Sequence, residues 1–267
     1  MLLPRALVAV LVHVLAGVLA PAPAAAQPGS APARPFLFSV STPHRDRPAM
    51  DVFVDTGFGE RAFDLVQGEA PEQRVGIQAA LGGRLTVVAR LGLADERDGV
   101  RSSQQGELLY GLVQSPTRRT SLAVGMGMRH EAQGVNVLLG RLVAGRSFAA
   151  WRLDGNALFE KPFAADRDRV DLITTVGVAR RVTPAFHVGV ELIGQDLEGF
   201  WEEDEAEGGA RVLIGPSLRV APPEARWQFA IAGGPVLHAT RSTRIVPLPP
   251  GRQREGFAVR CAVTYGM

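Results

Sequence analysis

The chain has 267 residues, of which 46% are hydrophobic, and its 29 Lys and Arg against 27 Asp and Glu give a formal net charge of +2. A charge so close to balance excludes the electrostatic footprint of a nucleic-acid-binding protein. The only cysteine, Cys261, excludes an internal disulfide and a multi-thiolate metal site.

The first 26 residues have the pattern of a secretory signal peptide. Arg5 precedes an apolar run from Ala6 to Leu19, and the small residues Ala24–Ala26 form a cleavage site. We expect cleavage before Gln27, which leaves 28 basic and 27 acidic residues because Arg5 is removed. The mature chain is of ordinary length for one β-barrel domain.

Residues 27–48 are rich in Pro and Ala, and only Phe36–Val40 has strand character. We expect this segment to be a periplasmic lead-in. The alternative makes Phe36–Ser41 an extra strand. No later apolar run approaches the roughly 20 residues that a spanning helix needs. If the chain crosses a membrane, it must therefore do so with strands, in a barrel domain at 49–267.

Apolar side chains then recur at every second position. Val52, Val54 and Phe58 share one parity, and Asp51 and Asp55 share the other. Successive side chains of a strand point to opposite faces, so this pattern predicts a strand with one apolar and one polar face. Phe53 and Val88 are exceptions to this alternation, because they are apolar residues on a polar face. Eleven further strands are predicted at or near 74–81, 84–93, 105–113, 119–130, 135–143, 151–160, 169–180, 186–195, 211–220, 226–238 and 257–265.

The connections between these strands alternate between short and long. The short set is 82–83, 114–118, 144–146, 181–185 and 221–224. The other set is 94–104, 160–167, 197–207 and 240–255, with a brief exception at 131–134. This alternation is typical of an all-β, up-and-down outer-membrane barrel with small periplasmic turns and larger outer loops. We predict twelve antiparallel strands. Fourteen is the alternative, if Phe36–Ser41 pairs and the first strand breaks at Gly57–Gly59.

Strand length favours lipid outside the barrel and water inside it. Strands of about 9 to 11 residues match the hydrocarbon thickness, and a ring of twelve is too wide for an inward apolar face to fill as a core. Aromatic residues near strand ends could form the interfacial girdles. They are Phe58, Trp151, Phe159, Phe186, Trp227, Phe257 and Tyr265.

Charged residues on the polar faces are the candidate functional residues. They are Arg74, Arg90, Arg129, Arg152, Asp154, Asp171, Glu191, Arg211, Arg219, Arg226 and Arg260. Opposed charges, such as Glu191 with Arg211 or Arg219, would form an electrostatic constriction that sorts solutes. The alternative is a structural salt-bridge plug, since a buried charge needs a partner.

Other chemistry has weaker support. The acidic segment 197–207 lacks the spacing of a calcium loop, so a solvated loop is the stronger interpretation. For a hydrolase, His130 or His238 would have to lie beside Ser121 or Ser242, and nothing in the sequence brings them together. Pro216 and Gly233–Pro235 predict a bulge or a local break in the sheet.

Residues 189–199 (GVELIGQDLEG) and 208–217 (GGARVLIGPS) resemble uncharacterised bacterial outer-membrane barrels described as transporters, including relatives of proteins linked to aromatic-compound degradation. The resemblance covers mainly the last third of the chain. It implies a β-barrel and the passage of small molecules. Such barrels usually end in an aromatic residue, whereas this chain ends Tyr265-Gly266-Met267.

We therefore expect an integral barrel of the bacterial outer membrane, surrounded by lipid, that acts as a channel or transporter for small solutes. The alternative is a closed structural or adhesion barrel, and a barrel hydrolase is a third, weaker possibility. No enzymatic activity, cofactor, metal or nucleic-acid partner is expected.

Overall fold

A computed structural model describes residues 34–42, 48–60, 63, 65–66, 71–96, 99–115, 117, 119–164, 170–197, 210–239 and 255–267. Nearly all of them belong to twelve strands, or to the turns between them. The strands are β1 (Ala49–Gly59), β2 (Glu72–Gly82), β3 (Leu85–Glu96), β4 (Gly99–Ser115), β5 (Thr120–His130), β6 (Asn136–Phe148), β7 (Trp151–Pro162), β8 (Asp171–Arg181), β9 (Phe186–Gln195), β10 (Ala210–Val220), β11 (Trp227–Ala239) and β12 (Glu255–Gly266). No helix in the described part of the chain is long and apolar enough to span a bilayer.

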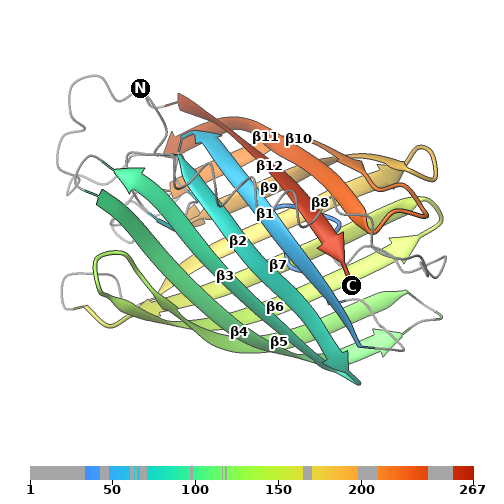
Figure 1. The fold of residues 1–267 in the computed structure, drawn as a ribbon, viewed down its shortest axis with the longest axis horizontal. Helices are drawn as coiled ribbons and strands as arrows, with labels where there is room; N and C mark the ends of the chain where they lie inside the picture. Colours follow the sequence, from blue (N-terminus) through green and yellow to red (C-terminus); the bar gives the residue numbers. More distant parts are fainter. Residues whose placement is uncertain are drawn as a thin grey trace.

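The strands form one closed antiparallel barrel in which each strand pairs with its neighbours in sequence (Figure 1). The barrel closes between β1 and β12, whose register runs from Asp51 opposite Gly266 to Gly59 opposite Ala258. This arrangement confirms the predicted twelve-strand, up-and-down topology. Residues 36–41 are not a strand, and β1 continues unbroken through Gly57, so the fourteen-strand alternative is wrong.

The period-two pattern corresponds to the two faces of the barrel wall. In β6, Leu142 points outward and is 47% exposed, whereas its neighbours Arg141 and Val143 point inward and are buried. In β1, Phe58 points outward and Asp55 inward. An outward apolar face cannot be covered by the protein itself, and closure removes the sheet edges that lipid could not tolerate. The outward face is therefore suited to hydrocarbon.

Aromatic side chains lie on the outward face near both ends of the barrel. Those at the end that holds the start of β1 and the end of β12 include Trp151, Phe186, Trp227 and Tyr265. Those at the opposite end include Phe58, Phe159 and Phe257, each at least 42% exposed. These are positions at which interfacial girdles occur in outer-membrane barrels.

Two predicted connections differ from the structure. Residues 94–104 were expected to form a long loop, but the β3–β4 ladder continues to Glu96 opposite Gly99. The sequence there is polar on both faces, as suits a strand that extends beyond the membrane into water. The turn expected at 144–146 lies instead at Ala149-Ala150, because β6 continues to Phe148. Two alanines carry no turn signal.

The predicted break in the sheet lies between β10 and β11. Pairing stops at Leu213 opposite Val236 and resumes at Ser217 opposite Ala232, with no change of register. Pro216 and Pro235 lie in this gap and cannot donate to the ladder. Both point outward and are exposed, so the lumenal wall stays continuous. The acidic segment 198–207 lies outside the described residues.

Candidate functional site: the barrel lumen

Residues 34–42, here called the plug segment, lie inside the barrel. All are buried or half-buried, and Phe36 and Val40 are each only 1% exposed. The sequence interpretation had placed residues 27–48 ahead of the barrel, in the periplasm. For the plug segment this is corrected, because its main-chain polar groups and its apolar side chains both find partners on the lumenal wall.

Three wall side chains hold the main chain of the plug segment. The Glu191 carboxylate accepts hydrogen bonds from the backbone N–H groups of Leu37 and Phe38, each 2.9 Å long. The Asn156 carboxamide accepts from the N–H of Val40 at 2.7 Å and donates to its carbonyl at 2.9 Å. Gln78 was not among the predicted lumenal residues; its side-chain amide donates to the Ser41 carbonyl at 2.7 Å.

The hydroxyl groups of the plug segment also bond to the wall. The Ser39 hydroxyl lies 2.9 Å from Thr175 Oγ1, and the Ser41 hydroxyl donates to Asp154. Both serine hydroxyls of this segment are thus satisfied by the barrel. Two other side-chain atoms of the segment, Arg34 Nη1 and Thr42 Oγ1, are buried without a hydrogen-bond partner among the described residues.

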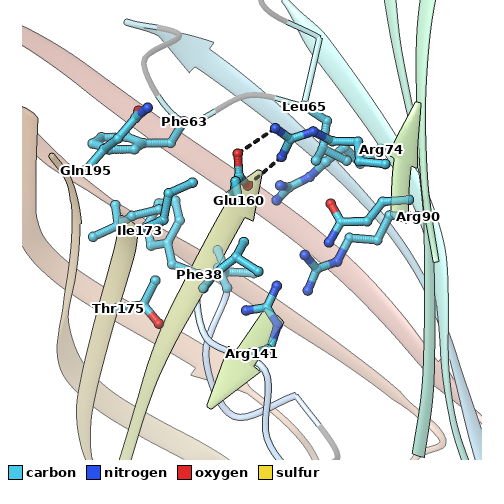
Figure 2. A pocket seen from close by; sticks show the side chains of 15 residues that line it. Phe38, Phe63, Leu65, Arg74, Arg90, Arg141, Glu160, Ile173, Thr175 and Gln195 are labelled. Atoms are coloured by element: carbon cyan, nitrogen blue, oxygen red, sulfur yellow. Dashed lines mark hydrogen bonds and ion pairs between the residues drawn. The ribbon is translucent and has the colours of Figure 1, made fainter. Parts of the chain in front are cut away.

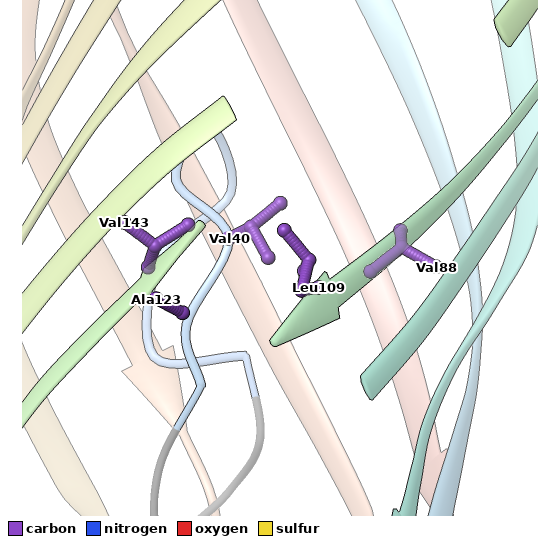
Figure 3. Close-up of a cluster of buried hydrophobic side chains, with 5 residues drawn as sticks. All are labelled: Val40, Val88, Leu109, Ala123 and Val143. Carbon is purple, nitrogen blue, oxygen red and sulfur yellow. The ribbon is translucent and has the colours of Figure 1, made fainter. Parts of the chain in front are cut away.

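Apolar side chains of the plug segment pack on different parts of the wall. Val40 packs among Val88, Leu109, Ala123 and Val143, from β3 to β6 (Figure 3). Leu37 packs against Ala232 of β11 and Ala262 of β12. The Phe36 ring lies over Gly177 of β8, where a Cβ atom would be 2.5 Å from the Phe36 Cδ1. The plug segment therefore contacts wall residues around much of the lumen.

At the start of the plug segment, Arg34 meets a buried network on β1, β2 and β12. Its guanidinium lies 3.5 Å from the centre of the Phe53 ring and 3.9 Å from the Asp55 carboxylate. Asp55 also accepts from Arg74 at 2.8 Å and from Arg260 at 2.5 Å. Arg260 donates in turn to Glu72 at 3.1 Å. Each charged group in this network thus lies beside a group of opposite charge, as buried charges require.

A second group of residues enters the lumen from the connection between β1 and β2. The backbone N–H of Val66 donates to Glu72 Oε1 at 3.0 Å, and the Val66 side chain is 1% exposed. Phe63 packs with Phe38 of the plug segment on a cluster formed by Ile193, Leu213 and Val236. The lumen is thus filled from both ends, and Phe38 and Phe63 bring the two fillings onto the same cluster.

Further ion pairs span the wall between strands that are not direct neighbours, from β5 to β7 and from β4 to β6. Arg129 donates to both oxygens of Glu160, at 2.6 and 2.5 Å, and to Glu131 at 2.9 Å. Arg141 donates to both oxygens of Glu107, at 2.5 and 2.9 Å. Such bidentate pairs are strong and directional, so they fix the orientation of the wall side chains.

A cavity of about 70 Å³ remains beside the plug segment. Figure 2 shows Arg74, Arg90 and Arg141 on one side and Phe38, Phe63 and Ile173 on the other. Glu160, already paired with Arg129, is the one acidic residue among its described lining residues. Solute-binding cavities typically measure about 300–1,000 Å³. With the plug segment in place, this space is therefore too small for a passing solute.

The predicted lumenal residues mostly point inward. Buried on the wall are Arg74, Arg129, Asp154, Asp171, Glu191, Arg219 and Arg260, and half-buried with inward parity are Arg90, Arg152 and Arg211. Arg226 does not point into the lumen. It is exposed in the turn before β11, which begins only at Trp227, so the alternation of strand faces does not apply to it. The ion pair expected between Glu191 and Arg211 or Arg219 is replaced by the two main-chain hydrogen bonds to Glu191.

Several lumenal residues were missed as candidates. They are Asp55, Glu72, Gln78, Glu107, Arg141, Asn156 and Glu160. The alternation placed Asp55, Gln78, Asn156 and Glu160 on polar faces, so parity alone could have identified them. Glu107 and Arg141 lie on strands for which no parity was assigned.

Of the residues considered for hydrolysis, His130 and Ser121 are not brought together. His130 and Ser121 stand nine positions apart on β5, a separation of roughly 30 Å at 3.3 Å per residue. His130 Nδ1 instead lies 2.9 Å from Asn136 Oδ1. Ser242 is outside the described residues.

No group of three or more His, Cys, Asp or Glu in the described part of the chain is arranged to hold a metal.

The closed even-stranded barrel, its outward apolar face and its charged lumen define an integral β-barrel of the bacterial outer-membrane type. The fold is similar to three solved porin structures, each of which covers 80% of this chain and matches over 98% of its own. They are the KdgM porin in complex with disordered oligogalacturonate (TM-score 0.54, 11% identity), the KdgM porin (0.53, 11%) and the NanC porin (0.56, 10%). No family model and no curated protein matches the chain.

Proposed function

We propose that the protein is an outer-membrane channel for small solutes, preferring anions, and that the plug segment holds it closed. The observation that carries this proposal is the cavity lined by four arginines, Arg74, Arg90, Arg129 and Arg141, inside a barrel that spans the bilayer. A cluster of arginines on one side of the lumen raises the local concentration of anions and repels cations.

Arg90 is the arginine best placed to meet a solute. Arg74, Arg129 and Arg141 each donate to a carboxylate of the wall. Arg90 lines the cavity but makes no hydrogen bond or close ion pair with any residue that the structure describes. Its guanidinium is therefore available to an incoming carboxylate or phosphate, which it could bind through two parallel hydrogen bonds.

The opposite wall of the cavity narrows the proposed solute class. With the plug segment withdrawn, Phe63, Leu158, Ile173 and Ile193 still present an apolar surface to the four arginines. An anion with an apolar or aromatic body would pair with the arginines and pack against the apolar side chains. The resemblance to barrels linked to aromatic-compound degradation supports an aromatic carboxylate. The structurally similar KdgM porin was solved with an acidic sugar chain, which supports an anion.

The reversal potential in a salt gradient tests this proposal. A barrel lacking residues 34–42 should conduct in planar bilayers and select anions. Arg90→Ala should reduce this selectivity, whereas Arg84→Ala, exposed at the β2–β3 turn, should leave it unchanged. A conducting barrel without ion preference would reject the anion channel.

A closed structural barrel is the second candidate, and the filled lumen favours it. In that case the ion pairs and the plug segment only stabilise the fold. Both the intact barrel and the barrel without residues 34–42 would then be silent in bilayers, although each remains folded.

A further inference from the structure

The hydrogen bonds that hold the plug segment go mainly to its main chain. Glu191 accepts from two consecutive N–H groups, Asn156 bonds to both the N–H and the carbonyl of Val40, and Gln78 donates to the next carbonyl. Paired bonds of the kind that Asn156 makes are those by which a neighbouring strand recognises an extended peptide. Every amino-acid residue except proline offers both groups.

The apolar contacts add a requirement for side chains at particular positions. In residues 36–41, the first residue is Phe36, whose ring needs the space above Gly177. The second residue, Leu37, contacts Ala232 and Ala262. The fifth residue, Val40, packs in the apolar cluster on β3 to β6. These contacts select apolar residues without demanding a unique sequence, since alanine, valine and leucine surfaces tolerate different apolar partners.

The wall groups that bind the main chain would be costly to leave empty. Glu191 is 2% exposed and Asn156 is 5% exposed. If the plug segment withdraws, these groups need water or another ligand with alternating donors and acceptors. A second polypeptide segment supplies that pattern in the same geometry.

We propose that Gln78, Asn156 and Glu191 form a lumenal peptide-binding site, at present occupied by the plug segment. Its ligand class is a peptide of about six residues that bends at its second and third positions, as residues 37 and 38 do, with apolar side chains at the first, second and fifth positions. Such a peptide binds in competition with residues 36–41 and blocks the lumen in their place. This site is distinct from the proposed Arg90 anion site and does not depend on conduction.

Fluorescence anisotropy in detergent tests the proposal directly. The probe is a labelled peptide with the sequence of residues 34–42, added to a barrel that lacks those residues. Saturable binding is expected. Methylation of the peptide nitrogen at Val40, which removes the hydrogen bond to Asn156, should weaken binding at least about tenfold. Methylation at Ser39, whose N–H makes no hydrogen bond among the described residues, is the matched control and should have a much smaller effect.

An Asn156→Leu barrel completes the test. It should bind the unmodified peptide weakly and no longer distinguish the Val40-methylated peptide from it. If the deleted barrel does not fold, the full chain with Leu37→Gly and Val40→Gly, which weakens the internal occupant, should bind the probe in the same way. The absence of saturable binding to a folded barrel, or equal effects of the two methylations, overturns the proposal. Because anisotropy detects binding alone, these results are independent of whether the barrel conducts.

Discussion

Gly177 is the residue that gives the plug segment its space in the lumen. A Cβ atom there would lie 2.5 Å from the Phe36 ring, whereas at Gly140, on the outward face, the nearest atom would be 3.9 Å away. Gly177→Val should push Phe36 away at a cost of about 1–3 kcal/mol. Chymotrypsin should then cut after Phe36 and Phe38 faster than in the wild type. Gly140→Val is the control, and equal protection of both variants would contradict this packing.

Arg260 is the residue on which the buried Asp55 network depends. It donates to both Asp55 and Glu72. Arg260→Gln removes the closest guanidinium from two buried carboxylates and leaves Glu72 only Arg74, 3.9 Å away, so we expect a loss of about 3–5 kcal/mol in the free energy of unfolding. Arg101→Gln removes a 4.0 Å pair with Glu96 whose arginine is 38% exposed, and should cost less than about 1 kcal/mol. Denaturation midpoints in detergent measure the stability loss of each variant. Similar losses for Arg260→Gln and Arg101→Gln would contradict the importance of the buried network.

The two apolar exceptions to the alternation, Phe53 and Val88, contact the plug segment. Phe53 lies under Arg34, and Val88 packs in the cluster around Val40. Their inward direction follows from strand parity. Their partners could not be predicted, because residues that meet in the lumen are far apart in sequence: Ser41 bonds to Asp154 across 113 positions and Leu37 to Glu191 across 154.

At the scale of single elements, the outward face of β6 provides a test of the membrane assignment. Leu142 lies at the middle of this strand and is 47% exposed. Leu142→Arg should destabilise the barrel in lipid by about 2–4 kcal/mol, whereas Leu85→Arg, beside the β2–β3 turn, should cost about 0–1 kcal/mol. Unfolding from lipid vesicles measures the two costs, and equal costs would mean that the face does not cross hydrocarbon.

The elements themselves were largely predictable. Strand faces follow from period two. The turn predicted at Gly82-Gly83 lies one residue later, at Gly83-Arg84, and glycine indicates it because Gly82 and Gly83 both have positive φ. The extension of β3 and β4 and the turn at Ala149-Ala150 were not predictable, because strands outside the membrane lose the alternation and alanine gives no turn signal. Phe36–Val40 has strand character in the sequence, but its position in the lumen was not predictable, because its partners lie on strands that only the closed barrel brings around it.

At the scale of the whole molecule, the lumen is closed by two fillings that enter from opposite ends. The plug segment and the group formed by Phe63, Leu65 and Val66 come together where Phe38 and Phe63 pack on one apolar cluster. The charged residues of the wall then have two roles. Paired residues such as Arg141 and Glu107 hold the strands together, while Arg90 faces the remaining cavity. We infer a channel that is complete but closed.

The most direct test of this account is the conductance of single barrels in planar bilayers, compared between the intact mature chain and the same chain without residues 34–42. We predict that the intact barrel is silent or opens only briefly, and that the shortened barrel conducts steadily. A folded, inserted barrel that remains silent without residues 34–42, or an intact barrel that conducts as well as the shortened one, would contradict it.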